Sequence, residues 1–174
     1  GKGALSGQLR SQLLAFVNQT VKEVGVCGRE ELLSRLGEHP NAKLAALGNS
    51  EEEATQKALE DCIASVTEEV RGKLVLNRIG AAYDGARSAV LAAFKRKAGQ
   101  TRKELTEAAQ DATGEVMSNA VFMRVARELA ALKDNVWVFK GAQWPEPGAA
   151  KEGGGDTTMT DAAGAAPTKG GAGG

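Results

Sequence analysis

Apolar residues recur at three- and four-residue spacing in several separate stretches of the chain, a pattern typical of helices with one buried face. The first stripe runs over Leu9–Val24 and is followed by Gly25, so we expect a helix that ends at this glycine. The next stripe, Arg29–Leu36, is short and is followed by Gly37 and Pro40, which predicts a helix of about two turns.

A further long helix is expected from Ser50, a good N-cap residue, to about Val66, with a loop before it. Glu51, Glu52 and Glu53 fall in its first turn, where carboxylates meet the positive end of the helix dipole. Alternating apolar and polar residues in 73–79 then predict a strand, with a hairpin turn at residues 69–72.

The same layout repeats after residues 80–85. Asp84 or Ser88 begins a helix that continues through Phe94 to Gly99, and Thr101 with Glu104 has the spacing of a capping box. Ser118 precedes a third apolar stripe, residues 121–132. After a turn at residues 133–135, Val136–Lys140 reads as a single clear strand.

Three helices followed by a β-hairpin are the element order of a winged helix, and the repetition predicts two copies of one module. The expected fold class is mainly α with short β: two tandem winged-helix modules, residues 8–80 and 84–141. Residues 145–174 have no apolar periodicity and are rich in Gly and Ala, which predicts a disordered tail. The alternative fold is an unrelated helical bundle, in which 73–79 and 136–140 are not strands.

Composition supports a helical fold, because aromatic residues make up only 4% of the chain and the core must be built from Leu, Val, Ile and Ala. The longest apolar runs, such as Ala89–Phe94, are far shorter than the roughly 20 residues of a membrane span, so no membrane partner is expected. Cys27 and Cys62 lie beside apolar neighbours, which favours buried free thiols and a reducing compartment. The glycine-rich start reads as an addition from expression.

Catalytic and metal chemistry find little support in the sequence. His39 is the only histidine and has no Cys pair near it, so a zinc site lacks its ligands. The chain contains no Gly-x-Ser-x-Gly elbow and no phosphate-binding loop. We therefore expect no enzyme activity, no cofactor and no small-molecule substrate.

The charge is divided unequally, although the chain as a whole has no net charge. Residues 8–80 hold nine Lys and Arg against eleven Asp and Glu, whereas residues 84–141 hold ten against seven. The second module is therefore the candidate for nucleic acid. The expected contacts are Arg124 and Arg127 on the outward face of the third helix, helped by Lys95, Arg96, Lys97, Arg102 and Lys103.

Against DNA binding, Glu128 and Asp134 are expected to interrupt this basic surface. In the first module the third helix is acidic and would repel phosphates, so a protein-binding role is expected there, with Glu60 and Asp61 as candidates. Trp144 is a further candidate for protein recognition, either packed back on the fold or loose.

Several of these segments resemble a known family, the Sin-like subunit of RNA polymerase III, which is the fifth of the class-specific subunits. The most specific piece is Asn135-Val-Trp-Val-Phe-Lys-Gly141, which is similar to the aromatic strand that ends this family's chain. Phe16-Val-Asn-Gln-Thr-Val-Lys-Glu23 and Glu30-Glu-Leu-Leu-Ser-Arg-Leu36 are similar in kind. The resemblance covers roughly residues 9–141, whereas the tail departs from the family pattern.

The resemblance implies a non-catalytic part of RNA polymerase III, located in the nucleus, that supports polymerase assembly or stability during transcription of short untranslated RNAs. Its partners would be other polymerase subunits. The family's N-terminal dimerisation part is missing, which implies a fragment. The alternative is a stand-alone DNA-binding regulator, for which Arg124, Arg127 and residues 95–97 must form one continuous basic face.

Overall fold

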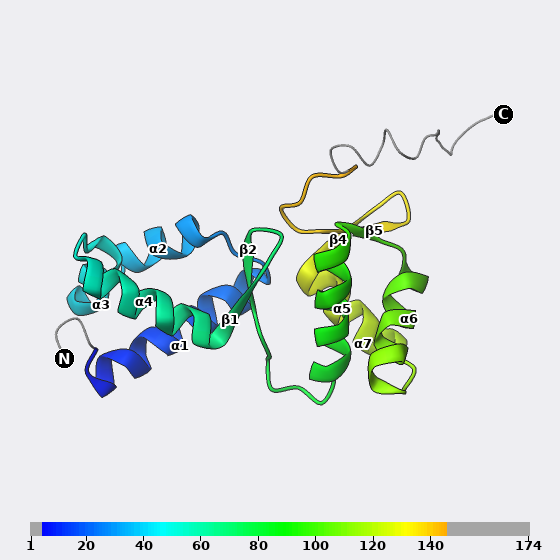
Figure 1. The fold of residues 1–174 in the computed structure, drawn as a ribbon, viewed down its shortest axis with the longest axis horizontal. Helices are drawn as coiled ribbons and strands as arrows, with labels where there is room; N and C mark the ends of the chain where they lie inside the picture. Colours follow the sequence, from blue (N-terminus) through cyan, green and yellow to red (C-terminus); the bar gives the residue numbers. More distant parts are fainter. Residues whose placement is uncertain (1–4, 146–174) are drawn as a thin grey trace.

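The computed structural model describes residues 5–145 as a mainly helical protein with a few short antiparallel strands. Figure 1 shows two helical bodies beside each other, with a pair of strands between them. We call residues 7–76 the first unit and residues 84–139 the second unit. The tail predicted for residues 145–174 lies outside the described residues, except for Pro145.

The first unit consists of four helices and one hairpin. In chain order these are α1 (Gly7–Val24), α2 (Arg29–Gly37), α3 (Ala42–Asn49), α4 (Glu53–Val66), β1 (Thr67–Val70) and β2 (Lys73–Leu76). Helix α1 begins after Ser6, whose side chain accepts a hydrogen bond from the Leu9 N–H, and it ends at Gly25 with φ of 82°. The expected end of the first helix is thus confirmed.

The expected loop before the third helix was wrong, because residues 42–49 form α3. Asn41 caps this helix by accepting a hydrogen bond from the Lys43 N–H, and Leu44 and Leu47, three residues apart, are buried. Ser50 therefore lies at the C-terminal end of α3 instead of capping the next helix. Glu52 is the N-cap residue of α4; its side chain caps no backbone N–H but accepts a hydrogen bond from the Thr55 hydroxyl at 2.7 Å, and only Glu53 falls in the first turn.

The hairpin of β1 and β2 is present where the sequence predicts it. The strands pair antiparallel, with Thr67 opposite Leu76 and Val70 opposite Lys73. Arg71 and Gly72 connect them with φ of 50° and 81°, the left-handed conformation that tight hairpin turns require. Cys27, between α1 and α2, forms an isolated antiparallel bridge with Leu74.

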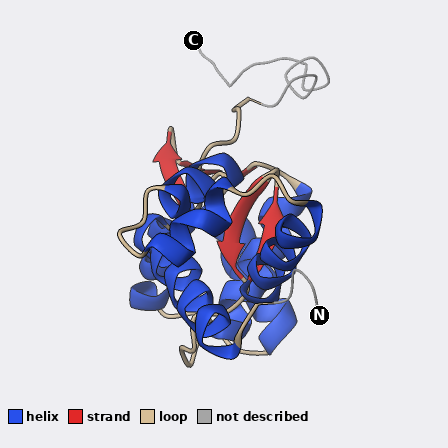
Figure 2. Ribbon diagram, turned by 90° about the vertical axis from the view of Figure 1, so that its left-hand side faces the viewer, coloured by secondary structure: helices blue, strands red, loops and turns tan. Residues whose placement is uncertain are grey.

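The second unit has the order helix, strand, helix, helix, strand, strand. Its elements are α5 (Asp84–Arg96), β3 (Gly99–Gln100), α6 (Arg102–Thr113), α7 (Asn119–Leu129), β4 (Ala130–Lys133) and β5 (Val136–Phe139). The strands form an antiparallel sheet in the order β3-β5-β4. The capping box of Thr101 and Glu104 is confirmed, and so is the cap of α7 by Ser118. In Figure 2 the helices are grouped around the strands.

The end of the second unit differs from the expectation of a single clear strand, because two strands form there. Helix α7 ends at Leu129 and the chain becomes extended at Ala130. Leu132 was expected on the helix, but it lies in β4 and is 55% exposed. Asp134 and Asn135 make the turn with φ of 51° and 66°. Since 73–76 and 136–139 are strands, a bundle without strands is excluded.

Each unit has its own core, and the β1–β2 hairpin contributes to both. Leu74 and Leu76 belong to the first-unit core, whereas Val70 and Val75 belong to the second-unit core. This division follows from the strand period of two, because successive side chains point to opposite faces. Buried on both faces, the hairpin joins the two units into one packed structure.

Polar contacts strengthen this joint. Lys95 on α5 pairs with Glu68 on β1 at 2.8 Å, and Lys140 donates to the carbonyl oxygen of Val24 at 3.3 Å. At Gly25 the backbones are so close that an added Cβ would lie 2.0 Å from the carbonyl oxygen of Glu128. A glycine is therefore required there for the two units to meet.

Candidate nucleic-acid and protein interface

The third helix of the second unit, α7, presents two arginines to solvent. Phe122, Val125 and Leu129 are buried on its inner side, while Arg124 and Arg127 are exposed. Neither guanidinium makes a hydrogen bond or an ion pair with another residue between 5 and 145. Both cations are thus available to an external anion, as the helical spacing predicts.

The expectation that Glu128 interrupts this basic surface was wrong. Its carboxylate turns inward and accepts two hydrogen bonds from Arg87 Nε, at 3.0 and 3.2 Å, and one from Arg87 Nη2 at 2.6 Å. The Arg87 side chain is 1% exposed and that of Glu128 is 18% exposed. The acidic charge is neutralised inside the unit, and the outward face of α7 keeps only cations.

Sequence reasoning missed this buried pair, although a signal was present. Arg87 lies three and four residues before Val90 and Leu91, on the apolar stripe of α5, and Glu128 lies three residues after Val125. A charged residue at a buried helical position requires a partner of opposite charge. Asp134, the other expected interruption, is exposed in the turn between β4 and β5.

Two of the remaining basic residues of the second unit are paired with carboxylates. Lys95 pairs with Glu68 at 2.8 Å, and Lys97 pairs with Glu104 at 2.9 Å. Burial acts to raise the pKa of Glu104, but hydrogen bonds from Thr101 and Lys97 outweigh it, so this pKa lies below its ordinary value. These two lysines, at the C-terminal end of α5, were expected to contact phosphates. Both are instead paired with carboxylates of the protein.

Of these basic residues outside α7, Arg102 makes contact with that helix. Its guanidinium lies 4.4 Å from the centre of the Phe122 ring and donates to the Asn119 side chain at 2.5 Å. Arg96 and Lys103 are exposed. The candidate nucleic-acid surface therefore comprises Arg124 and Arg127, with Arg102 beside the start of the helix.

The predicted protein-binding residues have separate places. Trp144 is half-buried and lies against Gly99, where an added Cβ would be 2.7 Å from the indole, so this side chain packs back onto the second unit. Glu60 on α4 forms an ion pair with Arg29 on α2, and Asp61 pairs with Lys57 at 3.6 Å.

Two open grooves were not expected from the sequence. The first-unit groove, of about 670 Å³, lies between α2, the end of α3 and α4, and is lined by Leu33, Leu47, Gly48, Ser50, Glu53, Ala54, Gln56, Lys57, Leu59 and Glu60. The second-unit groove, of about 510 Å³, is lined by Ala82, Tyr83, Gly85, Ala86, Thr113, Glu115, Val116, Met117, Ser118 and Val121. Val116 beside it is 75% exposed.

The histidine and the two cysteines, which were considered for metal or catalytic chemistry, make local contacts within the fold. His39 accepts a hydrogen bond from the Asn41 N–H through Nδ1, and its ring meets Phe16 edge-on at 5.4 Å. Cys27 and Cys62 are buried free thiols, and burial raises the pKa of both. Among residues 5–145 no three His, Cys, Asp or Glu side chains are close enough together to hold a metal ion.

None of the helices that the structure describes is long and apolar enough to cross a membrane. In comparisons with known proteins, no family model matches the chain, and no curated protein is significantly similar to it.

Proposed function

We propose that each unit is a winged-helix module. The order of elements in the second unit and its strand order β3-β5-β4 support this, because a winged helix places its first strand beside the last one. In the first unit, the bridge between Cys27 and Leu74 corresponds to the pairing of β3 with β5 in the second unit. Helix α3 has no counterpart in the second unit. The hairpins β1–β2 and β4–β5 are then the wings.

The tandem modules serve as a non-catalytic protein-binding platform of RNA polymerase III in the nucleus, and support its assembly or stability. One observation carries the platform role: the β1–β2 hairpin is buried between two cores, so both units present their grooves from a single packed body. A fixed relative position of two docking surfaces lowers the entropy cost of binding a large assembly.

The segment that resembles the polymerase subunit has a structural role in this body. Trp137 packs edge-on against Phe122 at 5.7 Å, and Phe139 lies 5.5 Å from Phe94. Lys140 bonds to the carbonyl of Val24 in the first unit, and Gly141 lies against the Lys73 side chain. The Trp-Val-Phe-Lys-Gly sequence thus closes the second core and holds it to the first unit.

Affinity purification of the tagged chain from nuclear extract, followed by mass spectrometry, tests this role. We expect polymerase III subunits to be enriched over a mock purification, with cross-links to α4 or to the α6–α7 connection. A purification without polymerase subunits, from extract in which a tagged catalytic subunit retains the others, would refute the polymerase role.

A second candidate is a DNA-binding regulator, and the inward position of Glu128 favours it because the outward face of α7 is left basic. A labelled duplex titrated at several salt concentrations tests it. Replacement of Arg124 and Arg127 by Ala should reduce the slope of log K against log salt by about 0.9 for each phosphate that the variant no longer neutralises. The matched control is Lys43→Ala on α3, an exposed cation of the first unit. Absence of salt-dependent binding by the unaltered chain excludes the regulator.

A further inference from the structure

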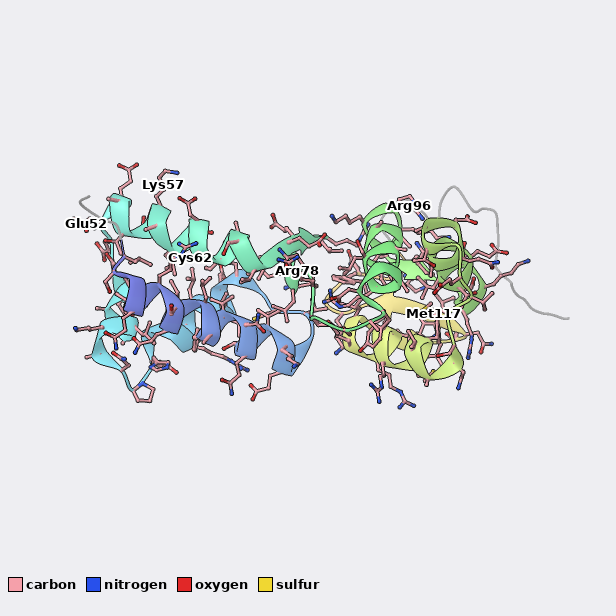
Figure 3. The ribbon with its side chains drawn as sticks, turned by 90° about the horizontal axis from the view of Figure 1, so that it is seen from below. Glu52, Lys57, Cys62, Arg78, Arg96 and Met117 are labelled. Atoms are coloured by element: carbon pink, nitrogen blue, oxygen red, sulfur yellow. The ribbon has the colours of Figure 1, made fainter. Side chains whose placement is uncertain are left out.

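The first-unit groove combines an apolar floor with small residues at its edge. Leu33, Leu47 and Leu59 supply the apolar part. The exposed Ala54 lines it without a long side chain, so the backbone of another chain can approach closely there, whereas the missing side chain of Gly48 makes room for Gly37 of α2. The groove is at the end of the first unit distant from the second, where Figure 3 shows Glu52 and Lys57 projecting outward from α4. The joint between the units therefore leaves it open.

Acidic side chains flank this floor. Glu53 and Glu60 both line the groove, and seven helical residues place them about 10 Å apart along α4. Glu51 and Glu52 are exposed next to Glu53. Among the described residues that line the groove, Lys57 is the only cation, and its charge is offset by Asp61 at 3.6 Å. The groove thus has an apolar floor with a carboxylate at each end along α4, and the carboxylate of Glu60 is already paired with Arg29.

Glu60 is held in place by Arg29 on α2. This contact uses one carboxylate oxygen, Oε1, and an ionised carboxylate has about four lone-pair sites. A second cationic donor can therefore bind the same carboxylate. Because Arg29 fixes its position, the Glu60 end of the groove is arranged before a partner arrives, and less side-chain entropy is lost on binding.

We infer that this groove binds an amphipathic helix of a partner protein, with apolar side chains on the groove floor and a Lys or Arg at each end. Two basic residues about seven positions apart on one helix face match the separation of Glu53 and Glu60. The elements around the groove are helices, which offer no sheet edge to an extended peptide, whereas a helix satisfies its own backbone groups. The inference rests on the proposed protein-binding role and names the partner class.

Synthetic helical peptides test the inference against the full chain. The probe carries two lysines about seven positions apart with leucines between them. One control peptide has glutamates in place of the lysines, and another has serines in place of the leucines. Amide chemical shifts locate the binding site, and titration gives the affinity. We expect shifts at Gly48 and Ala54 with the probe, and about five- to tenfold weaker binding of the glutamate peptide.

Variants of the chain separate the groove from other surfaces. Ala54→Trp fills the exposed edge of the groove and should abolish probe binding, and Glu53→Lys should reverse the preference for lysine over glutamate. The matched control is Ala92→Trp, at an exposed alanine of α5 in the second unit. Equal affinity for the lysine and glutamate peptides, shifts confined to the second unit, or no binding of the probe would overturn the inference.

The nuclear purification distinguishes failure of this inference from failure of the proposed function. If polymerase subunits are retained equally by the unaltered chain and by Ala54→Trp, the groove is not the docking site and the polymerase role stands. If neither chain retains them, the polymerase role fails. Loss of retention in Ala54→Trp but not in Ala92→Trp supports both.

Discussion

Removal of the Glu128 carboxylate should destabilise the protein more than removal of any exposed charge. Arg87 Nε and Nη2 both bond to this carboxylate, and the Arg87 side chain is 1% exposed. In Glu128→Ala the guanidinium stays buried without its partner. The unfolded chain, in contrast, hydrates Arg87 fully, so the variant favours unfolding.

The expected cost follows from the burial of the pair. Breaking a buried ion pair on one side costs about 3–5 kcal/mol, whereas an exposed pair contributes at most about 1 kcal/mol. For a chain of this size, the larger loss corresponds to a fall in Tm of about 10 °C. The double variant Arg87→Met with Glu128→Leu removes both charges and keeps apolar volume, so it should recover most of the stability.

Urea denaturation of the unaltered chain, Glu128→Ala and the double variant measures these differences. The matched exposed pair is Lys57 and Asp61, with side chains 77% and 66% exposed, for which Asp61→Ala should cost less than about 1 kcal/mol. A Glu128→Ala cost as small as this one, or a double variant no more stable than Glu128→Ala, would contradict an inward-facing neutralised Glu128.

Three further changes have defined outcomes. Gly25→Ala should cost about 3 kcal/mol in urea denaturation, because φ is 82° and the added Cβ would lie 2.0 Å from a backbone oxygen; a loss below about 1 kcal/mol would refute the close approach. The pKa of Glu104 is lowered in the folded state. The stability that its ionised carboxylate adds to the fold is therefore present above its ordinary pKa of 4.5 and is lost as the pH falls through the folded value. The Tm difference between the unaltered chain and Glu104→Gln should therefore shrink on acidification, and a difference that is constant with pH would refute this. Val116→Asp should leave Tm unchanged, because the side chain is 75% exposed, and should reduce polymerase retention, which Ala112→Asp on the outside of α6 should not; equal retention by both variants would remove the second-unit groove as a docking surface.

Most helices could be predicted from the sequence because their caps and apolar stripes agree. Ser118, Thr101 and Gly25 each end or begin a helix where the pattern requires it. Helix α3 was missed because only Leu44 and Leu47 mark its buried face, and Pro40 and Ser50 have the character of loop residues. A helix of eight residues with two buried leucines gives too weak a periodic signal.

The candidate site was harder to predict than the fold, because it depends on which way charged side chains turn. The spacing of Arg124 and Arg127 fixes their common exposed face, since their neighbours Val125 and Leu129 are apolar. For Glu128, helix position alone leaves two directions open, and the choice depends on Arg87 from another helix 41 residues away in sequence. Such long-range pairs, and the grooves that form between helices, arise only when the elements pack.

In the proposed winged-helix arrangement, the burial of the β1–β2 hairpin between the two cores limits how the two units could bind nucleic acid. A wing contacts DNA through its exposed strands and turn, but Val70 and Val75 lie in the second-unit core and Glu68 is paired with Lys95. The β4–β5 hairpin, in contrast, has exposed residues along β4 from Ala131 onward. Of the two units, only the second therefore has both a hairpin with an exposed strand and an outward basic helix face, that of α7. In the first unit, α4 and its groove are the proposed binding surface, where the carboxylates repel phosphates and favour a basic protein segment.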